Sequence, residues 1–275
     1  MTASSAARTP VPEVLPDGVT IEPIDAFKDN YIWCIRAGSR AVVVDPGESA
    51  PVLAALDADG LALAGILLTH HHADHIGGVA DLVRALGPMP VWGPADPRIT
   101  EATVHVGDGD RVVLDGLGAD GLAFDVIEVP GHTSSHIAFH GHGLLFSGDT
   151  LFSVGCGRMF EGTPPQMWAS LDRLAALPAS TRVFCGHEYT AANIAFARAV
   201  EPGNAAIDAW ATEVERLRAA GRPSLPSRIE TERATNPFLR CAQPEVARSA
   251  AAHAGRALEN PVEVFAELRA WKNAF

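Results

Sequence analysis

Short apolar segments recur along the first two thirds of the chain, and each ends at polar or turn-forming residues. They cover residues 41–45, 65–69, 124–129, 144–146 and 182–185. Aliphatic and β-branched runs of this length predict β-strands. Between them, apolar residues recur every three or four positions over 74–86 and 165–177, which is the spacing of an amphipathic helix. Strands that alternate with helices predict an α/β domain built in layers.

The pattern changes near residue 190, because beyond it only helical spacing remains. We expect helices over 191–200, 205–220 and 244–254, and a last helix that begins at Pro261, where Asn260 is a suitable N-cap. Residues 1–18 are rich in Ala, Ser, Thr and Pro and lack a basic start followed by an apolar core, so they predict a disordered leader rather than a secretory signal. The sequence thus predicts a leader (1–18), an α/β domain (19–189) and a smaller helical domain (190–275).

Composition and charge exclude two classes of protein. The 275 residues are 47% hydrophobic, but no apolar run approaches the roughly 20 residues of a membrane span. The formal charge is −12, and residues 1–189 contain 23 acidic against 10 basic residues. Such a field repels nucleic acid phosphates, so we expect neither a nucleic acid nor a membrane partner.

The four cysteines bear on the compartment of the protein. They lie far apart in the chain and form no C-x-x-C pair, which favours free thiols in a reducing compartment. We therefore expect a cytoplasmic protein, and we expect it to be a monomer.

Metal-ligand chemistry is concentrated in one segment, Thr-His-His-His-Ala-Asp-His at 69–75, between a predicted strand and a predicted helix. Side chains alternate in an extended stretch, so His70 and His72 point to one side and His71 points away. Asp74 and His75, at the start of the helix, can reach a second point nearby. One short segment can therefore supply two ligands to each of two neighbouring cations.

Further candidate ligands follow three other predicted strands, each directly after a glycine: His132, Asp149 and His187. Five histidines and two aspartates are too many for one tetrahedral ion but match two ions that share a carboxylate. These ligands suit zinc, iron or manganese, and the lack of a cysteine among them argues against a closed structural zinc site. The other histidines are expected to be structural: His71, His105, His136, His140, His142 and His253.

The motifs Thr-His-x-His-x-Asp-His, Gly-His-Thr, Gly-Asp-Thr and Cys-Gly-His-Glu-Tyr, in this order, resemble the metallo-β-lactamase superfamily and, within it, the glyoxalase II (hydroxyacylglutathione hydrolase) family. The likeness extends from Val19 to the C-terminus. It implies an αββα sandwich that holds the metals and a helical domain that closes over the glutathione part of the substrate. It places one metal on His70, His72 and His132, the other on Asp74, His75 and His187, and Asp149 between the two.

The same resemblance implies the residues that hold glutathione: Arg158, Phe160, Tyr189, Arg269 and Lys272. Phe160 stands where the family has a tyrosine, so one hydrogen bond to the substrate is lacking. Arg269 and Lys272 are three residues apart and therefore lie on one face of the last predicted helix. Positive charges there can offset the repulsion between the acidic first domain and an anionic substrate.

The resemblance implies hydrolysis of the thioester S-D-lactoylglutathione to D-lactate and glutathione, the second step of methylglyoxal detoxification. Two metal ions, zinc above all, would lower the pKa of a shared water, and the resulting hydroxide, with Asp74 and Asp149 as catalytic groups, would attack the thioester. Gly-x-Ser-x-Gly is absent from the sequence, which argues against a serine hydrolase.

Three other interpretations remain open. A mononuclear-iron glutathione persulfide dioxygenase has a similar histidine motif, but the helical tail with Thr-Asn-Pro-Phe at 235–238 favours the hydrolase. A β-lactamase fits the extra ligand His75 and the helical tail poorly. A non-catalytic metal-binding module is the weakest alternative, because every group that the reaction needs is present.

Overall fold

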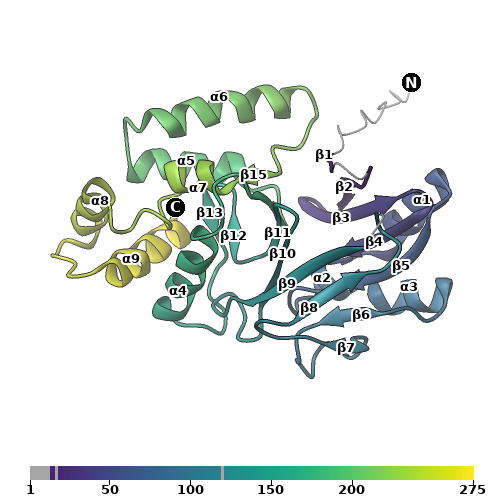
Figure 1. Cartoon of the computed structure of the whole chain (residues 1–275). Helices are drawn as coiled ribbons and strands as arrows, with labels where there is room; N and C mark the ends of the chain where they lie inside the picture. Colours follow the sequence, from purple (N-terminus) through teal and green to yellow (C-terminus); the bar gives the residue numbers. More distant parts are fainter. Residues whose placement is uncertain (1–12, 16–17, 119–120) are drawn as a thin grey trace.

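Two β-sheets packed face to face form the centre of the molecule, and helices cover both outer faces (Figure 1). The computed structural model describes residues 13–15, 18–118 and 121–275. These layers confirm the predicted αββα sandwich with a helical C-terminal region. Among the described residues, no helix has the length and apolar character needed to cross a bilayer.

The first sheet contains seven strands in sequence order: β1 (Glu13–Val14), β2 (Thr20–Ala26), β3 (Asn30–Ala37), β4 (Arg40–Val44), β5 (Ala62–Leu67), β6 (Val91–Gly93) and β7 (Val104–His105). The second has the order β15 (Ser227–Arg228), β14 (Arg182–Cys185), β11 (Leu144–Gly148), β10 (Ile137–Gly141), β9 (Leu122–Glu128) and β8 (Arg111–Leu114). A separate hairpin joins β12 (Leu151–Phe152) to β13 (Gly155–Cys156).

The helices fall into two groups (Figure 1). The first sheet is covered by α1 (Ser49–Asp59) and α3 (Val79–Leu86), and the short α2 (Ala73–Ile76) precedes α3. The second sheet is covered by α4 (Pro164–Ala175) together with α5 (Thr190–Val200), α7 (Ile229–Thr235), α8 (Pro244–Ala254) and α9 (Pro261–Ala274), whereas α6 (Ala205–Ala219) packs against α5.

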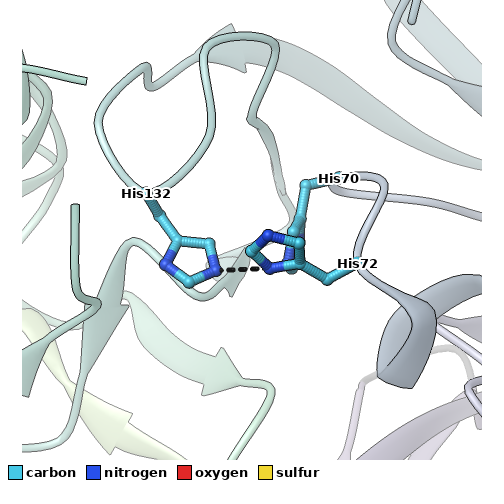
Figure 2. A group of neighbouring side chains, drawn as sticks. All are labelled: His70, His72 and His132. Carbon is cyan, nitrogen blue, oxygen red and sulfur yellow. Dashed lines mark hydrogen bonds between the residues drawn. The ribbon is translucent and has the colours of Figure 1, made fainter. Parts of the chain in front are cut away.

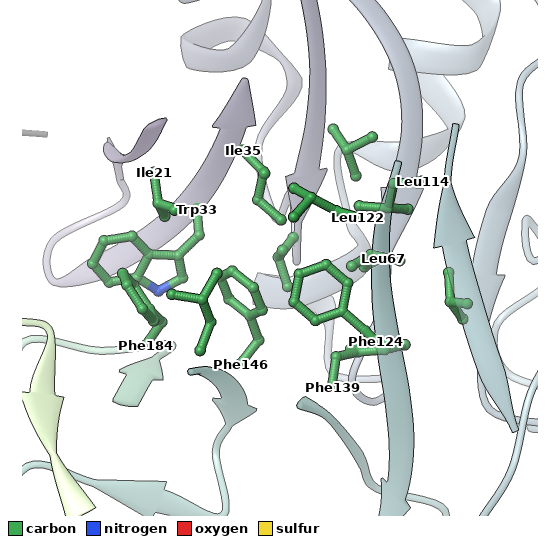
Figure 3. Close-up of a cluster of buried hydrophobic side chains, with 14 of the residues drawn as sticks. Ile21, Trp33, Ile35, Leu67, Leu114, Leu122, Phe124, Phe139, Phe146 and Phe184 are labelled. Carbon is green, nitrogen blue, oxygen red and sulfur yellow. The ribbon is translucent and has the colours of Figure 1, made fainter. Parts of the chain in front are cut away.

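The core between the sheets is rich in aromatic side chains. Trp33 on β3 packs edge-on against Phe184 on β14, with ring centroids 4.9 Å apart, and Phe146 lies against Phe184 (Figure 3). Alternate residues of β3 face the opposite way, so that Ile32 and Cys34 pack under α1 and α3. Burial on both faces explains why these strands read as apolar runs rather than as an alternating pattern.

Three sequence predictions need correction. Residues 13–15, assigned to the leader, belong to the fold, because β1 pairs with β2 and Leu15 is buried; residues 1–12 and 16–17 lie outside the described part. The helix predicted over 74–86 is two helices, α2 and α3, since Gly77 and Gly78 lie against the backbone of residues 46–48, where a Cβ would clash. The tail after residue 190 is not wholly helical, because β15 adds a strand to the second sheet.

The helical C-terminal region is hydrogen-bonded to the β12–β13 hairpin through a buried carboxylate. Glu232 on α7 accepts hydrogen bonds from the Val154 backbone N–H (2.7 Å) and from the Asn236 side chain (3.0 Å). The Asn236 amide also donates to the backbone oxygen of Gly155 (2.9 Å). Because the hairpin lies between Asp149 and Arg158 in the chain, this contact fixes the segment that connects two predicted site residues.

Burial raises the pKa of Glu232 to about 7, so its ionisation costs stability. The folded protein holds this proton more tightly than the unfolded chain, and stability is therefore lost as the pH rises from about 4.5 through 7. We predict that Glu232→Gln gains about 2 to 3 kcal/mol of stability relative to the wild type between about pH 5 and pH 8. Urea unfolding of both proteins at the two pH values measures this difference; a constant difference would show that Glu232 does not ionise in this range.

Candidate metal centre

Seven predicted ligands meet at one edge of the sandwich. They lie on loops that follow the carboxyl ends of β5, β9, β11 and β14 and on the short helix α2. Glycines permit the close approach: a Cβ on Gly148 would lie 2.3 Å from the Thr69 hydroxyl, and one on Gly186 would lie 2.8 Å from an Asp149 oxygen. The residues brought together are His70, His72, Asp74, His75, His132, Asp149 and His187.

Three histidines form the first group, with one ring nitrogen of each directed to a common point (Figure 2). The Nδ1 atom of His72 lies 3.2 Å from Nε2 of His70 and 2.9 Å from Nε2 of His132. The three ligand atoms lie within 4.8 Å of one another. This compact set of imidazole nitrogens is the kind of donor set that divalent transition metals prefer.

Asp74, His75 and His187 form the second group, whose ligand atoms also lie within 4.8 Å of one another. One Asp74 oxygen is 3.4 Å from Nε2 of His187 and 3.6 Å from Nε2 of His75. The same oxygen accepts a hydrogen bond from the Asn30 amide (3.0 Å), which orients the carboxylate.

Asp149 lies between the two groups. Its Oδ2 is 3.5 Å from Nε2 of His132 and 3.3 Å from Nε2 of His187, and its Oδ1 is 3.4 Å from Nε2 of His75. Asp149 Oδ1 and His75 Nε2 are both buried without a hydrogen-bond partner among the described residues. Buried polar atoms of this kind are costly unless a partner satisfies them, so the donor set fits two divalent cations that share Asp149.

The far nitrogens of the rings are held by protein groups. Nδ1 of His75 lies 3.0 Å from Asp45, Nδ1 of His187 lies 3.0 Å from Asp29, and Nδ1 of His132 lies 2.8 Å from the Arg158 backbone oxygen. Such partners fix the orientation of a ligating ring and leave its Nε2 free for a metal. Asp45 also accepts hydrogen bonds from Thr69, so its proximity to His70 and His75 marks a supporting group rather than a third metal position.

The sequence did not point to Asp29 or Asp45, and it predicted a structural role for His136 rather than a role as a ligand. His136 stacks on His70 with ring centroids 4.6 Å apart, and its Nε2 accepts a hydrogen bond from the Asp149 backbone N–H. A signal for Asp45 was present, since it directly follows β4 in the same way as the predicted ligands follow their strands. Asp29 and His136 have no such local signal.

Burial and charge set the protonation of the imidazoles. Burial lowers the pKa of His72 to about 4 and the pKa of His70 well below its usual value, so both rings are neutral, as a metal ligand must be. Burial also lowers the pKa of His187, but Asp149 and Asp74 outweigh it and raise that pKa to about 10. The carboxylates thus demand positive charge at this point, which a divalent cation supplies.

A cavity of about 650 Å³ lies beside the two groups of ligands. All five residues predicted to hold glutathione line it. Tyr189 stacks on His187 with ring centroids 4.6 Å apart. Phe160 lies at the rim, 64% exposed, with its ring edge-on to His72 and His132. The residues from the C-terminal part of the chain are Tyr189, Arg269 and Lys272, and those from the first part are Arg158 and Phe160.

The two cations of α9 are already engaged with protein atoms. Arg269 is only 5% exposed and donates to the Cys156 backbone oxygen (2.8 Å), while its Nε has no partner among the described residues. Lys272 donates to the Ala192 backbone oxygen (3.0 Å). Burial, followed by the nearby Arg269, lowers the pKa of Lys272 to about 8.

Comparison with known proteins agrees with this architecture. Residues 27–187 match the sequence profile described as "Metallo-beta-lactamase superfamily", the class that the αββα layers and the histidine groups define. Residues 188–275 match the profile described as "Hydroxyacylglutathione hydrolase C-terminus". Among solved structures, that of ETHE1 from Myxococcus xanthus is similar, with a TM-score of 0.59 and 26% identity over 92% of this chain and 98% of that one.

Curated relatives narrow the class to one family. A hydroxyacylglutathione hydrolase from Xanthomonas campestris pv. campestris (strain B100) is 56% identical over 92% of this chain and 97% of its own length. One from Cupriavidus taiwanensis is 53% identical over 93% and 98%, respectively. The chain belongs to the hydroxyacylglutathione hydrolase family.

We predict that Asp149→Ala removes both metals, because Asp149 faces both ligand groups and each group alone leaves a cation with three protein ligands. Elemental analysis of the purified variant measures this loss. Asp172→Ala, which removes an exposed carboxylate of α4, is the matched control and should keep the wild-type metal content. Retention of both metals by Asp149→Ala would refute the shared position.

Proposed function

We propose that this protein hydrolyses S-D-lactoylglutathione to D-lactate and glutathione. The observation that carries the proposal is the lining of one cavity, which contains both Asp149, in contact with both ligand groups, and the cations of α9. Relatives that are 53% and 56% identical over more than nine tenths of the chain carry the name hydroxyacylglutathione hydrolase.

We assign one metal to His70, His72 and His132 and the other to Asp74, His75 and His187, with Asp149 contacting both. Zinc is our first choice, and iron or manganese fits the same ligands. When bound, such cations supply an activated water at neutral pH and positive charge for the developing oxyanion. The protein contributes the geometry, because Asp29, Asp45 and the Arg158 backbone oxygen fix three of the ligating rings.

Asp74 is the acidic ligand that solvent in the cavity can reach. Its side chain is 41% exposed, whereas that of Asp149 is 9% exposed. Asn30 donates a hydrogen bond to one Asp74 oxygen, so the carboxylate is held ionised and oriented to accept a hydrogen bond from an attacking water. The leaving group is a thiolate, whose pKa of about 8.5 lets it depart without a dedicated acid.

The glutathione part of the substrate carries carboxylates, and the cavity offers three cations for them: Arg158, Arg269 and Lys272. Arg269 is buried and tied to Cys156, so we give it the role of organising the wall as well as of attracting the substrate. Lys272 is the more exposed cation of α9. Phe160 presents a ring without a hydroxyl and therefore contributes packing at the thioester end but no hydrogen bond.

The domain division at residue 189 remains a proposal, which the meeting of the two family profiles at 187 and 188 supports. The cytoplasmic location, the monomeric state and the lack of nucleic acid and membrane partners likewise remain predictions.

The direct test is release of thiol from S-D-lactoylglutathione by the purified protein, with metal quantified on the same sample. We expect catalytic thiol release that disappears on chelation and returns when metal is added. Oxygen uptake with glutathione persulfide, together with no thiol release from the thioester, would instead establish the dioxygenase alternative.

Lys272 gives the substrate-binding part of the proposal its own test. We predict that Lys272→Met raises KM about tenfold with little change in kcat, the effect of losing one charge-assisted hydrogen bond. Because the pKa of Lys272 is about 8, the wild-type kcat/KM should decline above pH 8 as the cation is lost, and the variant should lack this decline.

Arg248→Met is the matched control for Lys272→Met. It removes a cation from an exposed position of α8 outside the cavity and should leave KM unchanged. An unchanged KM in Lys272→Met, or the same pH profile in variant and wild type, would refute contact between Lys272 and the substrate.

A further inference from the structure

A cluster of charged and hydroxyl side chains beside the first histidine group has no role in the assignments above. At its centre, the guanidinium of Arg98 lies between two carboxylates. Its Nε and Nη2 donate to the two oxygens of Asp96 (2.8 and 2.7 Å). Its Nη1 and Nη2 contact the two oxygens of Glu161. Arg98 thus makes a paired contact with each carboxylate, an arrangement that only a guanidinium can span.

Each carboxylate continues into the loop that follows His132. Asp96 accepts a hydrogen bond from the Ser135 hydroxyl (2.5 Å), and Glu161 accepts from both the backbone N–H (2.7 Å) and the hydroxyl (2.8 Å) of Ser134. Ser134 and Ser135 stand two and three residues after His132. Arg98 therefore acts, through its two carboxylate partners, on the segment that positions one ring of the first metal group.

Glu161 also belongs to the segment that forms one side of the substrate cavity, since it directly follows Phe160. The backbone of this segment is joined to the His132 loop, because the Phe160 N–H donates to the His132 oxygen (3.2 Å) and the Gly162 N–H donates to the Gly131 oxygen (3.1 Å). Side-chain and backbone contacts thus fasten the same two segments to each other.

His71 closes the cluster on the side of the histidine motif. Its Nδ1 lies 3.6 Å from Asp96, and its Nε2 lies 3.6 Å from Glu161. The sequence prediction that His71 points away from the metals agrees with this placement. The ring thus lies near both carboxylates, so the 70–72 segment borders the cluster.

We propose that Arg98 is a positioning residue that, through Asp96 and Glu161, holds His132 in place for the first metal and holds the Phe160 segment in place for the substrate. The inference rests on the proposed metal centre. Asp96 is only 4% exposed, and a carboxylate can stay ionised in such a buried position only beside a positive charge, which Arg98 provides. Loss of Arg98 would leave two neighbouring carboxylates without their shared cation, and their repulsion would move both segments.

The first test is the rate at which the metal-loaded protein loses metal to a chromophoric chelator at 25 °C. We expect Arg98→Met to lose metal 10- to 100-fold faster than the wild type, the usual effect of removing a group that supports a metal ligand. Arg98→Lys, which keeps the charge but cannot span both carboxylates, should lie in between. Arg111→Met removes an exposed arginine–carboxylate pair between β8 and β9 and should match the wild type.

A second variant separates positioning from general stability. Glu161→Gln keeps the contact of Arg98 with Asp96 but removes the charge by which Glu161 binds Arg98 and Ser134, so the Phe160 segment is less firmly fixed. We therefore expect a several-fold rise in KM for the glutathione thioester, with kcat nearly unchanged. The measurement needs no Arg98 variant and so remains decisive if Arg98→Met does not fold. An unchanged KM in Glu161→Gln, or metal release from Arg98→Lys at the wild-type rate, would overturn the inference.

The chelator assay contains no substrate, so it distinguishes this inference from the proposed function. If the wild type releases thiol but Arg98→Met and Arg98→Lys retain metal as well as it does, the inference fails and the function stands. If the wild type does not release thiol but the variants lose metal faster, the positioning role at the metal centre stands without that function.

Discussion

The rest of the site depends on one buried negative charge. The Asp149 side chain is 9% exposed, lies among three imidazole rings and has one oxygen without a partner among the described residues. A carboxylate in such surroundings is stable only beside positive charge. Protonated histidines can supply part of it, which is why the pKa of His187 is raised to about 10. Two divalent cations would supply it while leaving the imidazoles neutral, and this requirement links the fold to metal-dependent hydrolysis.

The αββα sandwich meets this requirement by bringing distant segments to one edge. The ligands come from loops after four strands of two different sheets, and the aromatic core around Trp33 and Phe184 fixes the relative position of these sheets. Supporting groups come from still other segments: Asp45 follows β4, Asp29 precedes β3, and Asp96 follows β6. The helical tail adds the cations Arg269 and Lys272 to the cavity beside the two ligand groups, so the cavity is lined by both parts of the chain.

The sequence predicted what is encoded locally and missed what depends on long-range contacts. The 69–75 motif and the glycine-preceded residues His132, Asp149 and His187 could be identified because each follows an apolar strand, and the structure brings them together. Asp29, Arg98 and His136 could not, since their importance comes from neighbours far away in the sequence. The break at Gly77 and Gly78 was hidden for a related reason: helical periodicity continues across it, and only the adjacent backbone of residues 46–48 requires it. The strands β1, β6 and β7 of the first sheet were missed because they have only two or three residues, too few to show a pattern.

The central claim is that two metals share the Asp149 carboxylate. Anomalous X-ray diffraction from crystals of the metal-loaded protein tests it most directly, because each metal gives its own peak. The account predicts two peaks, one within ligand distance of His70, His72 and His132, the other within ligand distance of Asp74, His75 and His187, and Asp149 in contact with both. A single fully occupied peak, or two peaks of which only one is bound by Asp149, would contradict it.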